Sequence, residues 1–367
     1  MPHATHVVKS MWRDRRLLDL FGIEHPIVQA PMAGSQGSAL AIAVCEAGGL
    51  GSLPCALLSI EQARTEMQII RQRTDRPFNV NFFCHQPPVP DAAREAKWIE
   101  RLVPYAREFG VAAATVPGGR APFGDEACAL VEEFKPRVVS FHFGLPEKRL
   151  LDRVRAAGAV VIASATTVAE ARWLEERGVD AVIAQGAEAG GHRGIFLSDD
   201  ITSQPGTFAL VPQVVDAVRV PVIAAGAVGD ARGIAAALTL GAAGVQIGTA
   251  YLLTPEATNS PIHRAALKTA REDQTVLTNV FTGRPARGIV NRAVREVGPM
   301  SVDAPAFPGA SNAMTPLRQK AEASGSGDFS PLWSGQAPRF AREMPAGELT
   351  RELARSTLAL LEKMRTP

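Results

Sequence analysis

The sequence predicts an α/β protein, a (β/α)8 TIM barrel with a smaller helical lid domain. Three observations support this prediction: eight short apolar runs recur along the chain, helix-like stretches separate them, and the alternation stops after the eighth run. Strands that alternate with helices pair in parallel, and eight such units close most economically into a barrel. A doubly wound open sheet is the alternative architecture for the same alternation.

The predicted strands are rich in β-branched residues and end at Gly, Pro, Asn or a polar residue. They cover 26–32, 49–54, 78–83, 138–144, 160–165, 181–186, 221–226 and 244–250. Helices are predicted over 59–74, 168–178 and 231–241, and the last two end at glycine, which favours a helix C-terminus. The run 111–117 ends in Pro-Gly-Gly, so we assign it to the connection before the fourth strand.

The change of pattern after the eighth strand predicts the domain organisation. The barrel domain is expected over 17–254 and 336–367, the lid or substrate domain over 255–335, and an N-terminal extension over 1–16. The lid is helical around 263–273 and then rich in Gly, Ser and Pro up to Ser334. The tail 347–364 is amphipathic with a period of 3.6 residues, so it is expected to pack on the barrel as a helix.

Composition excludes several classes of function. The chain has 367 residues with 39 Lys+Arg against 37 Asp+Glu, a net charge of +2, and therefore carries no basic stripe for nucleic acid or an anionic membrane. Hydrophobic content of 46% and charged content of 21% are typical of a folded globular protein.

The cellular location is expected to be cytoplasmic. Cys45, Cys55, Cys84 and Cys128 show no CxxC spacing, which is typical of reduced thiols. The N-terminus lacks the apolar core of a signal peptide, and a mitochondrial presequence is the alternative for its basic residues. The uncharged segment 233–255 is long enough to cross a bilayer, but its glycines and Gln246 favour a helix, a turn and a strand. No membrane span is therefore expected.

The fold predicts where chemistry takes place. In a TIM barrel the active site lies at the carboxyl ends of the strands, and loops after strands seven and eight commonly hold phosphate. Here those loops are AAGAVGD (224–230) and QIGTA (246–250). Glycines let backbone N–H groups approach a phosphate closely, so a phosphate-bearing ligand is predicted. Two tight βα turns without a ligand are the alternative.

Two of the seven histidines, His142 and His192, end predicted strands four and six. Glycines flank His192 in QGAEAGGHRG (185–194), which leaves the imidazole open to act as a general base or as a partner of a developing anion. A hydrogen-bonded structural histidine is the alternative, and it applies more to His142, which lies in a core strand. Asn81 and Gln185 end strands three and six, where an amide suits a heteroaromatic ring or caps a loop.

Two rival chemistries have weaker support. A metal site would need His142, His192 and Asp230 as ligands, but the chain has no HxH or HExxH pair, so no metal is expected. A dehydrogenase with a cysteine nucleophile after strand six is excluded, because no cysteine follows Cys128.

A set of motifs, taken in order, resembles the nitronate monooxygenase family, formerly called 2-nitropropane dioxygenases. The motifs are QAPMAG (29–34), FNVNFF (78–83), VVSFHFG (138–144), AQGAEAGGHRG (184–194), PVIAAG (221–226) and QIGTA (246–250). The likeness runs from about Leu17 to the C-terminus; GGHRG and SFHFG are its specific parts. It implies a TIM barrel with a lid that binds FMN non-covalently. The implied reaction oxidises alkyl nitronates, including propionate 3-nitronate, with O2 to a carbonyl compound and nitrite.

The resemblance also implies residue roles. His192 is the expected catalytic residue, able to stabilise the nitronate anion or to remove the α-proton of a nitroalkane, and His142 is expected to contact substrate. The expected FMN contacts are Met32, Asn81, Gln185, Gly190, Gly226, Gln246, Ile247, Gly248 and Thr249. Ala227 stands where the family usually has a second glycine. Arg284 and Arg287 in the lid are expected either to bind a substrate carboxylate or to lie solvated on the surface.

The expected partners are therefore a small-molecule nitronate and O2, and the sequence leaves a homodimer open. Two alternative functions follow from the same motifs. One is an FMN-dependent NAD(P)H oxidoreductase acting on enoyl thioesters or quinones, because such enzymes resemble this chain in the APM and AGGH segments. The other is a flavin- or phosphate-binding protein without catalysis.

Overall fold

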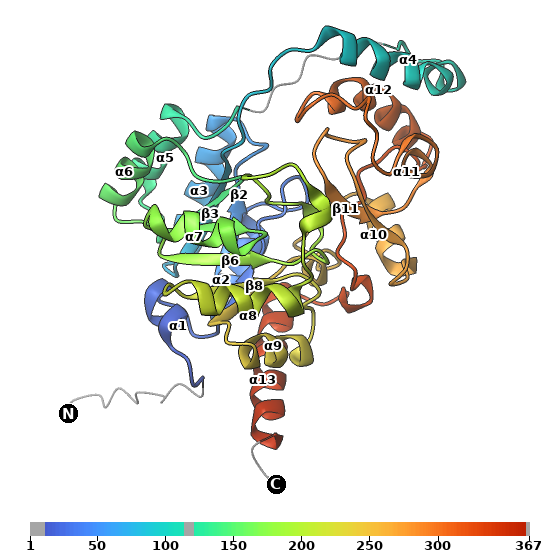
Figure 1. Ribbon diagram of the computed structural model, residues 1–367. Coiled ribbons are helices and arrows are strands. Elements are labelled where there is room, and N and C mark those ends of the chain that lie inside the picture. The colour runs from blue at the N-terminus through green and yellow to red at the C-terminus, as the bar shows by residue number, and fades with distance from the viewer. Residues whose placement is uncertain (1–11, 114–120, 365–367) are drawn as a thin grey trace, which may run out of the picture.

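All eight predicted strands form, and they pair in parallel in one sheet. The computed structural model describes residues 12–113 and 121–364 (Figure 1). The strands are β1 (Ile27–Gln29), β2 (Gly51–Pro54), β3 (Phe78–Phe83), β4 (Val138–His142), β5 (Val160–Ala165), β6 (Ala181–Gln185), β8 (Val222–Ala225) and β9 (Gly244–Ile247). Their order is β1-β9-β8-β6-β5-β4-β3-β2, and a parallel bridge between Val28 and Leu50 joins the two ends. The fold is therefore a (β/α)8 TIM barrel.

Helices surround this barrel. They are α1 (Arg16–Phe21), α2 (Ser38–Glu46), α3 (Ile60–Arg73), α5 (Asp125–Phe134), α6 (Lys148–Ala156), α7 (Val168–Glu176), α8 (Thr207–Ala217), α9 (Ala231–Thr239) and α13 (Ala346–Lys363). Short 3-10 turns are η1 (Ile201–Ser203), η2 (Thr249–Tyr251) and η3 (Pro338–Phe340). The predicted helices over 59–74, 168–178 and 231–241 are confirmed as α3, α7 and α9, and α3 begins with a capping box in which Ser59 and Gln62 bond to each other's backbone N–H.

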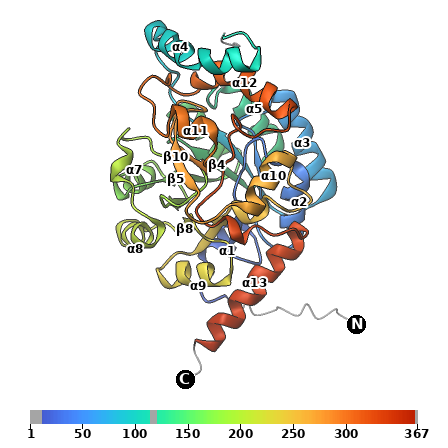
Figure 2. The same ribbon diagram turned by 90° about the vertical axis from the view of Figure 1, so that its right-hand side faces the viewer.

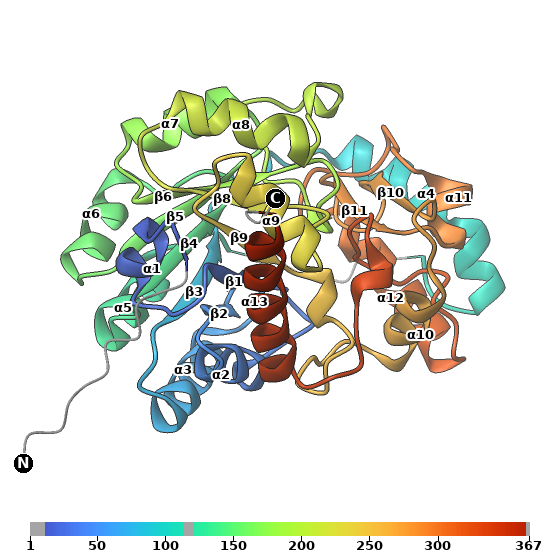
Figure 3. The ribbon, with the colours of Figure 1, turned by 90° about the horizontal axis from the view of Figure 1, so that it is seen from below.

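The tail helix α13 packs on the barrel, as its amphipathic pattern predicts. It contacts α9 and α2, and Figure 3 shows it lying along these helices. The uncharged segment 233–255 does divide into a helix, a turn and a strand, since it contains most of α9, all of β9 and η2. Within the described residues, no helix is long and apolar enough to cross a membrane.

The region after β9 contains more than helices. Its helices are α10 (Pro261–Thr269), α11 (Arg292–Val297) and α12 (Ala310–Ala323), and its strands are β10 (Thr275–Thr278) and β11 (Ala286–Ile289). β11 pairs antiparallel with both β10 and β7 (Gly191–His192), which leaves the barrel after β6. This small sheet was not predicted, because its strands have only two or four residues, too few to show a clear alternation. It links the lid directly to the segment that carries His192.

The segment between β3 and β4 forms a second part of the lid. Helix α4 (Ala92–Phe109) lies beside α12, far from it in sequence (Figures 1 and 2). Trp98, Leu102 and Ala106 of α4 are buried in an apolar cluster with lid residues such as Phe329. The Trp98 indole Nε1–H donates to the Ala310 carbonyl oxygen at 3.1 Å. The domain boundaries expected at 254/255 and 335/336 stay a prediction, and so does the N-terminal extension 1–16. Residues 1–11 of that extension lie outside the described chain. Part of the run 111–117, assigned to the connection before the fourth strand, also lies outside it.

The loop after β1 is fastened to the barrel by buried amides. Gln29 Nε2 donates to Gln36 Oε1 at 2.6 Å, and Gln36 Oε1 also accepts the Met32 N–H at 3.0 Å. The Ser52 N–H on β2 donates to Gln29 Oε1 at 3.0 Å. Buried polar groups need such partners, so the network fixes the position of Met32 at the mouth of the barrel.

Candidate active site

A cavity of about 550 Å³ lies between the carboxyl ends of the strands and the lid. The barrel contributes the loops 30–35, 189–192, 225–229 and 248–252. The lid contributes residues 258–260, one face of α12 and the segment 329–335. The position of the cavity agrees with the place where TIM-barrel enzymes carry their active sites.

The structure brings ten of the eleven predicted site residues to this cavity. They are Met32, Asn81, His142, Gln185, Gly190, His192, Gly226, Gln246, Gly248 and Thr249. Ile247 does not line it: its side chain is fully buried in the barrel core. Successive side chains of a strand point to opposite faces, so Gln246 and Ile247 of β9 cannot both face the same space.

His192 is held at the cavity by both its ring and its backbone. Its ring Nε2 lies 3.0 Å from Thr282 Oγ1. The Thr282 hydroxyl also lies 3.3 Å from the Arg284 carbonyl oxygen, and the imidazole tautomer decides which atom donates in the His192–Thr282 contact. The backbone of His192 pairs with Ala286 of β11. The lid and the barrel thus position this residue together.

His142 acts on His192 through the backbone. His142 Nε2 lies 3.2 Å from the His192 carbonyl oxygen, and His142 Nδ1 lies 3.1 Å from Ser164 Oγ. A carbonyl oxygen only accepts, so Nε2 carries the proton and Nδ1 accepts from the serine hydroxyl. Burial lowers the pKa of His142 to about 3, which keeps the ring neutral.

The turn after β6 is folded back by two more side chains. Gln185 Nε2 donates to the His192 carbonyl at 3.0 Å, and Gln185 Oε1 accepts the Gly194 N–H at 2.7 Å. Arg193 is fully buried and donates to the Gln185 and Gly186 carbonyls at 2.6 and 2.5 Å. Burial lowers the pKa of Arg193 to about 10, so the guanidinium still carries its charge at neutral pH. These contacts fix the loop that presents His192.

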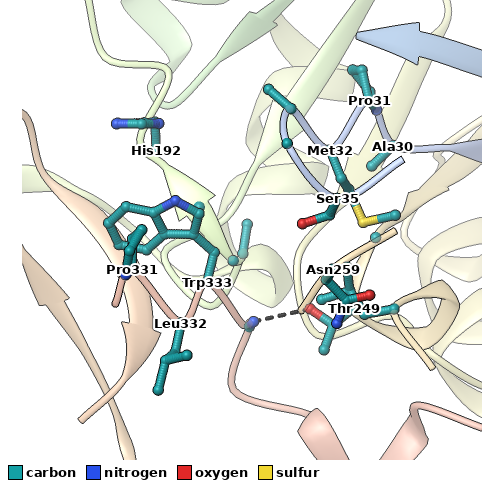
Figure 4. Close-up of a pocket in the computed structure, with 18 of the residues that line it drawn as sticks. Ala30, Pro31, Met32, Ser35, His192, Thr249, Asn259, Pro331, Leu332 and Trp333 are labelled. Carbon is teal, nitrogen blue, oxygen red and sulfur yellow. Dashed lines mark hydrogen bonds between the residues drawn. The ribbon is translucent and has the colours of Figure 1, made fainter. Parts of the chain in front are cut away.

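Aromatic side chains surround the His192 ring. The ring centroids of Phe83, Phe143, Phe307 and Trp333 lie 6.2, 5.9, 5.4 and 5.6 Å from that of His192. Figure 4 shows His192 and Trp333 on one side of the cavity, with Met32, Thr249 and Asn259 on the other. Such an apolar wall keeps water away from the imidazole and strengthens its electrostatic interactions.

The two glycine loops lie side by side, because β8 and β9 are neighbours in the sheet. Gly226 has φ +121°, and a Cβ there would lie 2.6 Å from Thr207 Oγ1. Ala227, where the family usually has glycine, adopts φ +56°, so the loop keeps a left-handed conformation. The Thr249 hydroxyl accepts the Gly335 N–H at 3.0 Å, which ties the second loop to the segment 329–335 (Figure 4).

Buried polar atoms in the cavity lack partners within the described chain. They are Gln246 Oε1 and both amide atoms, Oδ1 and Nδ2, of Asn259. Asn259 is 7% exposed and faces the cavity. Buried donors and acceptors of this kind are satisfied by a polar ligand or by water, and a flavin ring and its ribityl chain offer both kinds of group. The residues present therefore fit FMN, with glycine loops for its phosphate and amides for its polar atoms.

Sequence reasoning missed Asn259 because TNSP (258–261) reads as the start of a helix, and Ser260 does cap α10. Arg284 and Arg287 were expected either to bind a substrate carboxylate or to lie solvated on the surface, and both alternatives were wrong. Arg284 donates to the Ile195 carbonyl and lies 4.2 Å from the Phe143 ring centroid, and Arg287 donates to the Ala187 carbonyl at 2.9 Å. Both join the lid to the loop after β6 and neither lines the cavity.

Asp230, imagined as a metal ligand, caps α9 by accepting the Arg232 and Gly233 N–H groups. Across 12–113 and 121–364, no three His, Cys, Asp or Glu residues are grouped so as to hold a metal ion. The fold and the site together define an enzyme of the TIM-barrel class that acts on a small organic molecule at the carboxyl ends of its strands.

Comparison with known proteins identifies the family. The family model for nitronate monooxygenase matches residues 14–356. Nitronate monooxygenases of Paraburkholderia phytofirmans and Pseudomonas aeruginosa are 42% and 43% identical, over 96% and 92% of this chain and 97% of each relative. The crystal structure of nitroalkane oxidase from Streptomyces ansochromogenes has a TM-score of 0.88 and 40% identity, covering 95% of this chain and 99% of that one. FabK from Thermotoga maritima has a TM-score of 0.71 and 28% identity, covering 95% and 98%.

The chain belongs to the nitronate monooxygenase family and is an oxidoreductase. The resemblance noted in the sequence motifs is thereby confirmed.

Proposed function

We propose that this protein is an FMN-dependent nitronate monooxygenase that oxidises alkyl nitronates, among them propionate 3-nitronate, with O2 to a carbonyl compound and nitrite. The observation that carries the proposal is His192, held by Thr282, Gln185 and His142 at a cavity with unpaired amide atoms. Family membership and the relatives named nitronate monooxygenase support it.

Bound FMN would accept electrons from the nitronate and pass them to O2. The residues that would hold FMN form two groups, one for its phosphate and one for its ring and chain. Gly226, Gly248 and Thr249 offer backbone and hydroxyl groups at the paired loops, where a phosphate fits. Asn81, Gln246 and Asn259 offer amides to polar ring and chain atoms, and Met32 offers an apolar contact to the ring.

His192 has the contacts needed for two roles. As a hydrogen-bond donor or cation it stabilises negative charge on a nitronate, and the aromatic wall increases this effect by excluding water. With a neutral nitroalkane, it removes the α-proton as a general base. The contacts from Gln185 and His142 to its carbonyl hold the imidazole in place for either role.

The location proposed for the enzyme is the cytoplasm. All four cysteines are buried and free, and burial raises the pKa of Cys45 and Cys55 to about 12. Buried neutral thiols are typical of proteins in a reducing compartment.

The second candidate function is an FMN-dependent NAD(P)H oxidoreductase acting on an enoyl thioester or quinone. The likeness to FabK, at 28% identity over nearly the whole chain, is the observation that favours it. Both candidates use the same barrel mouth. They differ in what gives electrons to the flavin: a nitronate in the monooxygenase and NAD(P)H in the reductase.

The test is the visible spectrum of the purified protein, followed by anaerobic mixing with propionate 3-nitronate and, separately, with NADH. We expect flavin bands that change with the nitronate and not with NADH, and nitrite formation once air is admitted. Rapid bleaching by NADH alone would favour the reductase. A protein without flavin would contradict both functions.

A further inference from the structure

Helix α12 has two different faces. Ala310, Ala313, Leu317 and Ala321 are buried in the cluster that joins α12 to α4. Ser311, Thr315, Arg318 and Glu322, which follow one another at spacings of four, three and four residues, line the cavity. Such spacings place residues on one stripe of a helix. Helix α12 therefore adds a polar stripe to the cavity, in contrast to the aromatic wall around His192.

Arg318 is the guanidinium on this stripe, and its Nε is buried without a hydrogen-bond partner. In the part of the chain that the structure describes, Arg318 also forms no ion pair. Glu322, one turn further along, has Oε1 hydrogen-bonded to Ser330 Oγ at 2.7 Å. Arg284 of the lid also has a buried Nε without a partner, but its guanidinium donates to a backbone carbonyl, as that of Arg287 does, whereas no hydrogen bond from Arg318 is found in the described chain. Arg318 as a whole is half-buried, and a buried N–H donor without a partner, such as its Nε, is costly unless a ligand supplies the acceptor.

We propose that Arg318 binds a carboxylate on the tail of the substrate, so that this enzyme prefers nitronates that carry a carboxylate at the end remote from the nitronate carbon. The inference rests on the proposed function and deepens it. A guanidinium presents parallel N–H groups that match the two oxygens of a carboxylate. Among the substrates proposed above, propionate 3-nitronate has such a carboxylate, whereas simple alkyl nitronates do not.

The first test compares kcat/KM for propionate 3-nitronate and for propyl-1-nitronate, whose tail is uncharged. In Arg318→Met we expect kcat/KM for the carboxylate substrate to fall about 10- to 100-fold, the range for a hydrogen bond to a charged group. KM should carry most of the change, because the carboxylate does not react. The value for propyl-1-nitronate should change less than about threefold, and Arg318→Lys should recover part of the loss.

Lys320→Met is the matched control. It removes one cation from the same helix, but Lys320 is exposed and does not line the cavity. We expect it to leave both substrates unchanged. Glu322→Gln tests the neighbouring charge: it removes a repulsive carboxylate from the cavity, so KM for propionate 3-nitronate should fall while that for propyl-1-nitronate stays the same.

A binding measurement gives a readout apart from turnover. Succinate has the length and the two negative charges of propionate 3-nitronate but cannot be oxidised in this way. Quenching of tryptophan fluorescence, to which Trp333 at the cavity contributes, should report succinate binding to the flavin-loaded wild type. The same titration should show at least tenfold weaker binding to Arg318→Met, and no change in Lys320→Met.

Equal losses on both nitronates in Arg318→Met, or no loss on either, would overturn the inference. Loss of bound flavin in Arg318→Met would also overturn it, by assigning the guanidinium to the cofactor. These outcomes are distinct from a failure of the proposed function, in which the wild type would oxidise neither nitronate.

Discussion

His142 Nε2 lies 3.2 Å from the carbonyl oxygen of His192, so the two histidines are joined through the backbone rather than through their rings. Gln185 Nε2 donates to the same carbonyl at 3.0 Å. Two side chains, one from the end of β4 and one from the end of β6, thus hold one peptide group. This arrangement leaves the His192 ring at the cavity; His142 lines the same cavity, and its contact with the substrate stays a prediction.

The first prediction separates the two roles of His192. In His192→Asn, nitroalkane oxidation should fall by at least about 100-fold, because asparagine cannot accept the α-proton, whereas much of the nitronate oxidation should remain. The measurement is kcat/KM for nitroethane and for ethylnitronate, with flavin content as the control for binding. Equal losses on both substrates would rule out the role as base.

The second prediction concerns pH and His142. Its folded-state pKa of about 3 lies below the ordinary value of 6.5, so the unfolded chain binds more protons between these pH values. The free energy of unfolding should therefore fall as pH is lowered from 6.5 towards 3, and this contribution is complete above 6.5. His142→Gln keeps a donor to the His192 carbonyl but does not titrate.

Urea denaturation of the wild type and of His142→Gln at pH 7.5 and pH 4.5 checks this. The variant should lose less stability between the two pH values than the wild type does. Identical losses would show that His142 is not held neutral in the folded protein.

A third prediction follows from the close approach of two backbone segments. A Cβ at Gly190 would lie 2.5 Å from the Gly335 nitrogen. Gly190→Ala should therefore push the segment 329–335 away, with a lower melting temperature and reduced flavin content. Gly233→Ala is the matched control, because a Cβ there lies 3.4 Å or more from its neighbours and alanine favours the helix α9. Equal effects of both changes would argue against a specific contact at Gly190.

A fourth prediction tests the contact between α4 and α12. Trp98→Phe keeps most of the buried area but removes the hydrogen bond to the Ala310 carbonyl, which should cost about 1 kcal/mol of unfolding free energy. Because α12 lines the cavity, KM for propionate 3-nitronate should rise while flavin content stays constant. Trp173→Phe, on α7 of the barrel, is the control and should leave KM unchanged. A constant KM in Trp98→Phe would show that the position of α12 does not depend on this contact.

The barrel was predictable because its signals are local. Each strand is a short apolar run, each helix has its own ends, and eight repeats of the unit have one economical closure. The same holds for His192, Gly226 and Gly248, which occupy strand ends or the loops directly after them. The side chain of Ile247 does not line the cavity, because the motif QIGTA does not show which residues of a strand share a face.

Residues that act through distant contacts were not predictable. Asn259 reads as part of a helix start, yet its amide faces the cavity without a partner. Arg284 and Arg287 were expected to bind a substrate carboxylate or to lie solvated, yet they bind carbonyls of the loop after β6. Arg318 carries no motif at all, and its place at the cavity depends on the packing of α12 against α4.

The sequence by itself determined the barrel, the order of its strands along the chain, the glycine loops and the histidine at the sixth strand, because periodicity and turn residues act over a few neighbours. Only the tertiary structure decided which strands of the lid pair with β7, which helix covers the barrel mouth, and which arginine faces the cavity. These depend on contacts between residues far apart in the sequence, such as His192 with Thr282, 90 positions apart, and Trp98 with Ala310, 212 positions apart. Their free energy arises only when packing brings the groups together.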